Sequence, residues 1–231
     1  MSNRFIASVN KIKTKGYWSF DVIPKNISTN SPLNLLDLSE IAQRSSVQLR
    51  GWDFPHISRQ NAENQDMYNA NDHIESWVDW NMYKEVWRLY TDGQFACRKA
   101  FREDWHPSIE SLKYIDCEEV IHILSEFFIF IDNLWFEKIY QDQIELKISL
   151  YCTNDRLLKL FNSQKAQLFS EYKCHVNTID VVRIFSYKEF HDKHLSFALE
   201  FAEYIFEQFN WLNMPKKSFQ EDQKALLERR L

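Results

Sequence analysis

Residues 50–107 concentrate the side chains that could do chemistry. This stretch holds most of the chain's eight tryptophans and begins with the motif Arg-Gly-Trp-Asp-Phe-Pro-His. Arg50 could clamp a carboxylate or phosphate or stack on Trp52, and Pro55 fixes the chain direction so that His56 projects predictably. Because Trp and Arg bring large contact areas and directional donors, their density predicts a specified pocket or a partner-facing surface.

We therefore expect a binding surface over residues 50–56 and 77–105. Its predicted members are Arg50, Trp52, Asp53, His56, Trp77, Trp87, Arg88, Arg102 and Trp105. A corner of the core explains the same residues, if Trp52, Phe54 and Trp87 pack there and Arg50 neutralises a buried carboxylate. The sequence leaves both interpretations open.

An alternative chemistry is metal-dependent cleavage of nucleic acid. Glu145 and Lys147 flank one residue of an apolar strand and match the Glu-x-Lys half of a nuclease motif, in which the carboxylate holds Mg²⁺ and the lysine orients water. Asp132 could be the second carboxylate, although it lies in a predicted helix. A half-solvated strand produces the same pattern without catalysis.

Two further ligand sites can be considered. His191 and His194 are one helical turn apart and could share a metal with Cys174 or His175, but exposed polar residues that open a helix explain them more simply. We predict no metal and no cofactor. Arg50, Arg88 and Arg102 could instead bind a small anionic ligand.

The composition excludes several classes of protein. The chain has only three glycines, none near another, so phosphate-cradling loops of NTPases and dinucleotide-binding domains are absent. A net charge of −5 argues against nucleic acid as the main partner. The four cysteines form no CxxC pair, which favours free thiols and a cytoplasmic location. No apolar run is long enough to span a membrane.

The helices and strands that must position these residues are predicted to form a single α+β domain over residues 1–231. Alternating residues predict strands at 17–23, 47–49, 74–80, 143–152 and 176–185, and Asp92-Gly93 predicts a hairpin turn between 82–90 and 94–102. Helical spacing predicts helices at 35–44 and 116–135, one beginning at 191, and a charged terminal helix at 216–231. Residues 58–71 are expected to form a long loop. The sheet, largely antiparallel or mixed, should pack against two long helices.

The motif Leu49-Arg50-Gly51-Trp52-Asp53-Phe54-Pro55-His56, with residues 85–90, 93–95 and 103–105, resembles a family of uncharacterised bacterial proteins. The resemblance extends across most of the chain but implies no activity. A rich recognition surface without a catalytic set favours a non-catalytic sensor or adaptor subunit that binds another protein within a bacterial assembly. The oligomeric state is not predicted.

Overall fold

Strand β1 (Tyr17–Pro24) organises the fold because its alternate side chains serve the two faces of one sheet. Trp18, Phe20 and Val22 are buried on one face, whereas Ser19 and Asp21 lie on the other. β1 pairs antiparallel with β5 (Phe95–Ala100) on one side and with β7 (Gln143–Tyr151) on the other. It therefore joins the two halves of the sheet.

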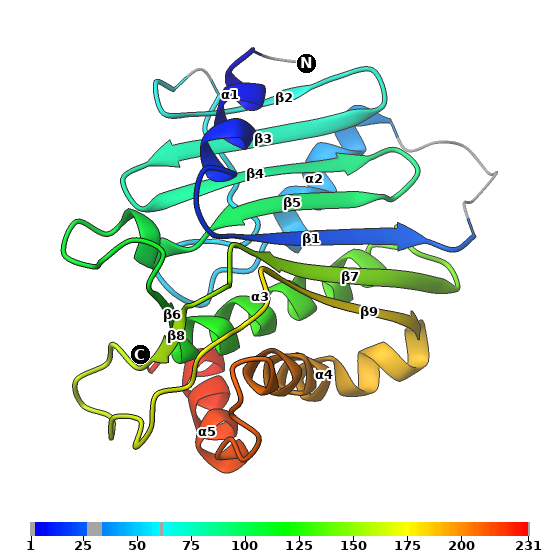
Figure 1. The fold of residues 1–231 in the computed structure, drawn as a ribbon. Coiled ribbons are helices and arrows are strands. Elements are labelled where there is room, and N and C mark those ends of the chain that lie inside the picture. The colour runs from blue at the N-terminus through cyan, green and yellow to red at the C-terminus, as the bar shows by residue number, and fades with distance from the viewer. Residues whose placement is uncertain (1–2, 27–33, 61, 231) are drawn as a thin grey trace.

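The computed structural model describes residues 3–26, 34–60 and 62–230, and it forms one α+β domain (Figure 1). In this part of the chain, seven strands form an antiparallel sheet in the order β2-β3-β4-β5-β1-β7-β9. The elements not yet bounded are α1 (Asn3–Ile12), α2 (Leu35–Ser45), β2 (Gln65–Asn69), β3 (His73–Trp80), β4 (Tyr83–Tyr90), η1 (Arg102–Trp105), β6 (Tyr114–Asp116), α3 (Cys117–Phe136), β8 (Leu157–Lys159), β9 (Thr178–Ser186), α4 (Tyr187–Glu207) and α5 (Lys216–Leu227). β6 and β8 pair in parallel, apart from the main sheet.

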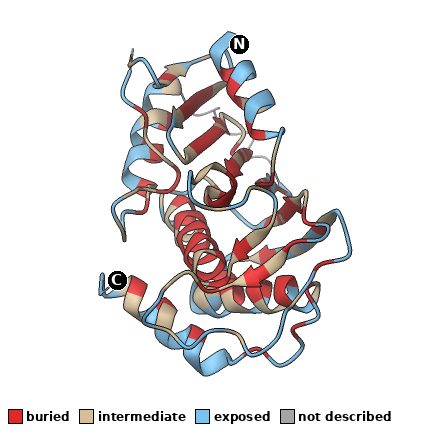
Figure 2. Cartoon of the chain, turned by 60° about the vertical axis from the view of Figure 1, so that its left-hand side comes forward, coloured by how far each residue is buried: buried red, intermediate tan, exposed pale blue. Residues whose placement is uncertain are grey.

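Helix α3 is the centre of the main core. Asp116 caps its first turn by accepting a hydrogen bond from the Glu118 amide at 3.1 Å. Its apolar side chains then run nearly all round the helix, so it is buried between the sheet, α4 and α5, as Figure 2 shows. The ring of Phe128, for example, contacts the rings of Phe127, Phe185, Phe190 and Phe201. Helix α3 therefore packs against the sheet as a rigid, buried element.

The sheet separates two environments, which we call the α3 face and the α1 face. On the α3 face, α2 and α3 cover a continuous core. On the α1 face, α1 covers only part of β3, β4 and β5, through a smaller cluster that includes Phe5, Ile12 and Trp77 (Figure 1). Because alternate side chains of a strand point to opposite faces, each strand residue lies on either the α3 face or the α1 face.

The α+β class, the strands at 17–23, 74–80, 143–152 and 176–185, and the helices at 35–44 and 116–135 are confirmed. Residues 82–90 form strand β4, and the Asp92-Gly93 turn connects it to β5. The terminal helix predicted at 216–231 ends at Leu227, and Leu231 lies outside the described residues. The expectation of two long helices corresponds to α3 and α4.

Three local predictions were wrong. The strand expected at 47–49 is a single bridge between Val47 and Phe54, because the chain turns back at once. The loop expected at 58–71 contains strand β2, which forms by pairing with β3; Asn61 lies outside the described residues. Helix α4 begins at Tyr187, four residues before the predicted start, because Phe190 is buried against α3.

Candidate functional site

The segment 46–58 lies on the α3 face, and Phe54 anchors it there. The amides of Val47 and Phe54 donate to each other's carbonyls at 2.8 and 2.9 Å, which closes the segment into a narrow loop. The Phe54 ring is buried against Phe20 and Phe127. A large aromatic side chain in the core thus fixes the position of the residues on either side of it.

Arg50 lies at the base of this loop and binds two carboxylates of α3. Its Nε and Nη2 donate to the two carboxylate oxygens of Glu126 at 2.8 and 2.9 Å, and its Nη1 donates to Glu119 at 2.5 Å. Glu119 also accepts from Arg102 at 3.2 Å. The side chain of Glu126 is only 2% exposed. The guanidinium of Arg50 is therefore already paired with protein groups.

The charges around Arg50 shift the pKa values of its partners. Burial alone would raise the pKa of Glu119, but the positive charges of Arg50 and Arg102 outweigh it and lower that pKa to about 2. At Glu126 the effect of burial exceeds that of the Arg50 charge, so the pKa of Glu126 is raised above its ordinary value despite the hydrogen bonds from Arg50. His122, on the same helix, has its pKa lowered to about 4 by burial and by the Arg50 charge.

Trp52 forms the centre of an aromatic stack. Its ring stacks on His56 at 4.1 Å between centroids and on Tyr83 at 4.3 Å, with the planes inclined by 21° and 11°. Trp80 extends the stack, 5.9 Å from Trp52, and is 50% exposed. The Arg102 guanidinium lies 5.1 Å from the Tyr83 centroid. We call Trp52, His56, Trp80, Tyr83 and Arg102 the aromatic surface.

Asp53 and His56 form an ion pair that holds the loop in shape. His56 Nδ1 lies 2.5 Å from the Asp53 carboxylate, and Nε2 lies 2.9 Å from the Gln65 side chain. Burial alone would lower the pKa of His56, but the hydrogen bond and charge of Asp53 outweigh it, so the pKa is raised. The His56 amide donates to Glu85 at 2.7 Å.

Several predicted site residues lie elsewhere. Trp87 is 1% exposed in the core of the α3 face, where its Nε1 donates to the His56 carbonyl at 2.7 Å. Trp77 is 4% exposed and packs on the α1 face. Their burial gives both tryptophans a packing role. Alternate residues of a strand point to opposite faces, so the Trp- and Arg-rich residues 50–107 are distributed over both faces of the sheet.

Arg88 and Trp105 also belong to the α1 face. Arg88 donates to the buried carboxylate of Glu75 at 2.6 and 2.8 Å and covers the Phe5 ring of α1. Trp105 lies beneath the ammonium groups of Lys15 and Lys84, at 4.4 and 4.5 Å from the ring centroid. Arg50, Arg88 and Arg102 therefore do not converge on one ligand.

Two pockets adjoin the aromatic surface and share the side chains of Arg102 and Glu119. The smaller, about 210 Å³, is lined by Arg50, Gly51, Trp52, Asp53, Tyr83, Lys99, Arg102, Glu119 and Glu126. The larger, about 380 Å³, is lined by Met82, Arg102, Glu103, His106, Ser108, Ile109, Asp116, Glu119 and Phe161. Together they place arginines and carboxylates beside exposed aromatic rings.

The shared wall carries polar atoms without partners. Within the described residues, Oε1 of Glu119 and Nε of Arg102 are buried and make no hydrogen bond. Buried polar atoms are normally paired, so a water molecule or a bound polar group would complete this network. Burial also raises the pKa of Glu103 to about 8 and that of Asp116 to about 7. The larger pocket thus contains two carboxyl groups that can hold protons near neutral pH.

Trp80 and Tyr83 lie within the predicted range 77–105 but were not among the named binding residues, and the carboxylates of α3 were missed. Trp80 and Tyr83 flank the turn between β3 and β4, where Asn81 has a φ of 48°. Glu119 and Glu126 are seven residues apart, which places both on one side of a helix. The available signal was Glu126, an acid within the most apolar stretch of the helix, because a buried carboxylate needs a cation as its partner.

The residues of the nuclease alternative are not brought together. Asp132 lies on α3 and accepts from His191 at 2.9 Å. Glu145 and Lys147 alternate with buried Leu146, so they lie on the opposite face of the sheet from α3. There Glu145 pairs with Lys25, and Lys147 lies 3.7 Å from Asp180. One metal ion cannot contact all three side chains.

The histidine pair also has other partners. Nδ1 of His191 faces Asp132, and Nδ1 of His194 lies 3.0 Å from the His191 carbonyl. Across residues 3–26, 34–60 and 62–230, no three His, Cys, Asp or Glu side chains are grouped as metal ligands. The four cysteines are free, and Cys174 is buried with its thiol near the Val176 carbonyl.

The chain matches no known family model, and no curated protein is significantly similar to it in sequence. In the described part of the chain, no helix combines the length and the apolar run that a bilayer crossing requires. Any functional proposal therefore depends on the geometry of the sites themselves.

Proposed function

We propose that this protein is a non-catalytic sensor or adaptor subunit of a bacterial, cytoplasmic assembly, and that it binds a partner protein through the aromatic surface. The observation that carries the proposal is the position of Trp80. This side chain is 50% exposed at the outer end of a stack whose other rings, Trp52 and Tyr83, line the smaller pocket together with Arg102 and Glu119.

The composition of the surface suits protein recognition. Trp, Tyr and Arg dominate the binding energy of protein interfaces. Trp and Tyr bury a large area at a low cost in side-chain entropy, and Arg adds several directional hydrogen-bond donors. Here stacking already restrains the rings of Trp52 and Tyr83. A partner that covers Trp80 would therefore gain apolar burial without first ordering the surface.

The adjoining pockets add polar specificity. The larger one contains three carboxyl groups, Glu103, Asp116 and Glu119, and one arginine, Arg102. Because Glu103 and Asp116 can hold protons near neutral pH and Glu119 is already paired with Arg50 and Arg102, uncharged hydrogen-bonding groups of the partner would match this pocket. A small anionic ligand is less favoured, because Arg50 and Arg102 both donate to Glu119 and Arg88 lies on the other face.

The experiment compares protein capture by two matched variants. Trp80→Ala removes the exposed ring of the aromatic surface, and Phe136→Ala removes a 78% exposed ring at the end of α3. Each tagged protein is incubated at low salt with lysate of the source organism, and co-purifying proteins are identified by mass spectrometry.

The proposal predicts one stoichiometric protein that wild type and Phe136→Ala retain and Trp80→Ala loses. Recovery of the same protein with Trp80→Ala, or of none with wild type, contradicts it. Thermal unfolding of each variant shows whether the loss reflects binding, since a variant that keeps the wild-type midpoint has kept its fold.

A further inference from the structure

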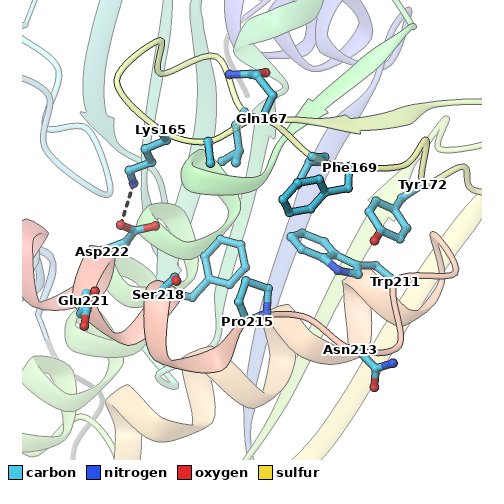
Figure 3. Close-up of a pocket in the computed structure, with 14 residues that line it drawn as sticks. Lys165, Gln167, Phe169, Tyr172, Trp211, Asn213, Pro215, Ser218, Glu221 and Asp222 are labelled. Atoms are coloured by element: carbon cyan, nitrogen blue, oxygen red, sulfur yellow. Dashed lines mark ion pairs between the residues drawn. The ribbon is translucent and has the colours of Figure 1, made fainter.

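A second pocket, of about 580 Å³, lies far along the chain from the aromatic surface. It is enclosed by residues 165–169 of the loop after β8, by the connection between α4 and α5, and by the first half of α5 (Figure 3). Its volume is within the range of about 300–1,000 Å³ that small-molecule sites occupy. None of the residues considered for the partner-binding surface lines it.

One end of this pocket is aromatic. Trp211 is 6% exposed, stacks on Tyr172 at 4.9 Å and contacts the Phe219 ring edge-on at 5.7 Å, so it forms a rigid wall. Phe169 lines the same end from the loop, yet its side chain is fully exposed. Figure 3 shows Phe169 beside Trp211. A flat ring placed between Phe169 and Trp211 would bury the Phe169 surface that now faces water.

The other end of the pocket is acidic. Figure 3 shows Asp222 and Glu221 at the end away from Trp211. Lys165 is shared between Asp222 at 2.6 Å and Glu118 at 2.9 Å, so two carboxylates compensate its charge. Glu221 is exposed and makes no ion pair or hydrogen bond with the described residues. This end therefore retains negative charge that a cation could match.

We propose that this pocket binds a small aromatic amine, with its ring against Phe169 and Trp211 and its ammonium group toward Glu221 and Asp222. On α5, Phe219 contacts Trp211 at the aromatic end, and Ser218 lies one helical turn, about 5.4 Å, before Asp222 at the acidic end. A flexible carbon chain between ring and nitrogen would follow this face of the helix. The ring supplies the apolar burial, and the charge decides the selectivity.

Calorimetric titration with two ligands that share a ring tests the charge. Tryptamine carries an ammonium group, and indole-3-propionate carries a carboxylate on the same indole. We expect tryptamine to bind at least about tenfold more tightly, a difference of about 1.4 kcal/mol. Equal affinities, or no heat from tryptamine at millimolar concentration, would overturn the proposal.

Variants of exposed residues test the two ends separately without endangering the fold. Phe169→Ala should weaken tryptamine binding about tenfold. Glu221→Gln should reduce the preference for tryptamine over indole-3-propionate. Leu212→Ala removes a 71% exposed side chain that does not line the pocket and should leave affinity unchanged. Unchanged binding in both Phe169→Ala and Glu221→Gln places tryptamine elsewhere and refutes the assignment.

Discussion

Arg50 and Glu126 form a two-point ion pair in which both carboxylate oxygens accept from one guanidinium, at 2.8 and 2.9 Å. The pair joins the loop 46–58 to α3 and is largely excluded from solvent. Arg50, the residue that the sequence marks most strongly for binding, therefore holds the fold together beneath the aromatic surface. A change at Arg50 alters stability before it alters recognition.

Arg50→Ala should lower the free energy of unfolding by about 3–5 kcal/mol, because it leaves the buried carboxylate of Glu126 without a cation. Urea denaturation monitored by tryptophan fluorescence measures this loss. The double variant Arg50→Met/Glu126→Leu removes both charges and should recover most of the lost stability, since Glu119 keeps its bond to Arg102. If the single variant is as stable as wild type, the pair has no structural role.

Gly16→Ala should destabilise the protein by about 1–3 kcal/mol through overpacking. A Cβ at Gly16 would lie 2.3 Å from both Arg156 Nη2 and the Phe101 ring. Arg156 cannot move aside easily, because it is completely buried and bonded to Asp104 at 2.6 and 2.8 Å. The control is Gly51→Ala, where a Cβ meets no atom within 4 Å. Equal denaturation midpoints for the two variants would contradict the packing described here.

His56→Gln should cost more stability in acid than in alkali. The folded pKa of His56 is raised, so its pair with Asp53 stabilises the protein fully below the unfolded-state pKa of about 6.5. That contribution is lost as the pH rises through the raised pKa. The free energies of unfolding of wild type and variant, compared at about pH 5.5 and about pH 9, measure it. If the difference in free energy of unfolding between wild type and His56→Gln is the same at both pH values, Asp53 and His56 do not form a charged pair.

Glu103→Gln should gain stability relative to wild type as the pH rises. Burial raises the pKa of Glu103 to about 8, whereas the unfolded side chain titrates near its ordinary value of 4.5. Between these values the unfolded chain has released the proton that the folded chain still holds, so wild-type stability falls with increasing pH. The amide retains the acceptor for the Asp116 backbone amide, now at 2.6 Å from Glu103.

Denaturation midpoints at about pH 5 and about pH 8.5 test this sign. Glu110→Gln is the matched control, since its carboxylate is 68% exposed and pairs with Lys113 on the surface. The difference between Glu103→Gln and wild type should grow in favour of the variant at the higher pH, while that of Glu110→Gln stays small. A constant difference for Glu103→Gln shows that its carboxyl group is ionised in the fold.

The strongly patterned elements were predictable because local sequence and burial agree in them. Residues 116–135 have an acid cap and an apolar run, and residues 143–152 alternate strictly. Helix α1 was not predicted, since its stability comes from packing Phe5 and Ile12 on a sheet face that only tertiary structure creates. Strand β2 likewise depends on its pairing with β3.

The site was predictable only in part. The motif at residues 49–56 does lie beside exposed aromatic rings, but sequence alone cannot say which face of a sheet a tryptophan occupies when helices cover both faces. Trp77 pairs with Val86 and Trp87 pairs with Ser76, so the two tryptophans of adjacent strands lie on opposite faces. Exposure at Trp80 follows from its place at a turn, which the hydrophobic pattern does not encode.

Photo-crosslinking from position 80 shows directly whether a partner protein covers the aromatic surface. A photoreactive phenylalanine analogue replaces Trp80 in one protein and Phe136 in a second, and both are irradiated in lysate of the source organism. We expect a covalent adduct with one defined protein from position 80 and none from position 136, and unlabelled wild-type protein should compete for that adduct. The same adduct from both positions, or no adduct from position 80, would contradict partner binding at the aromatic surface.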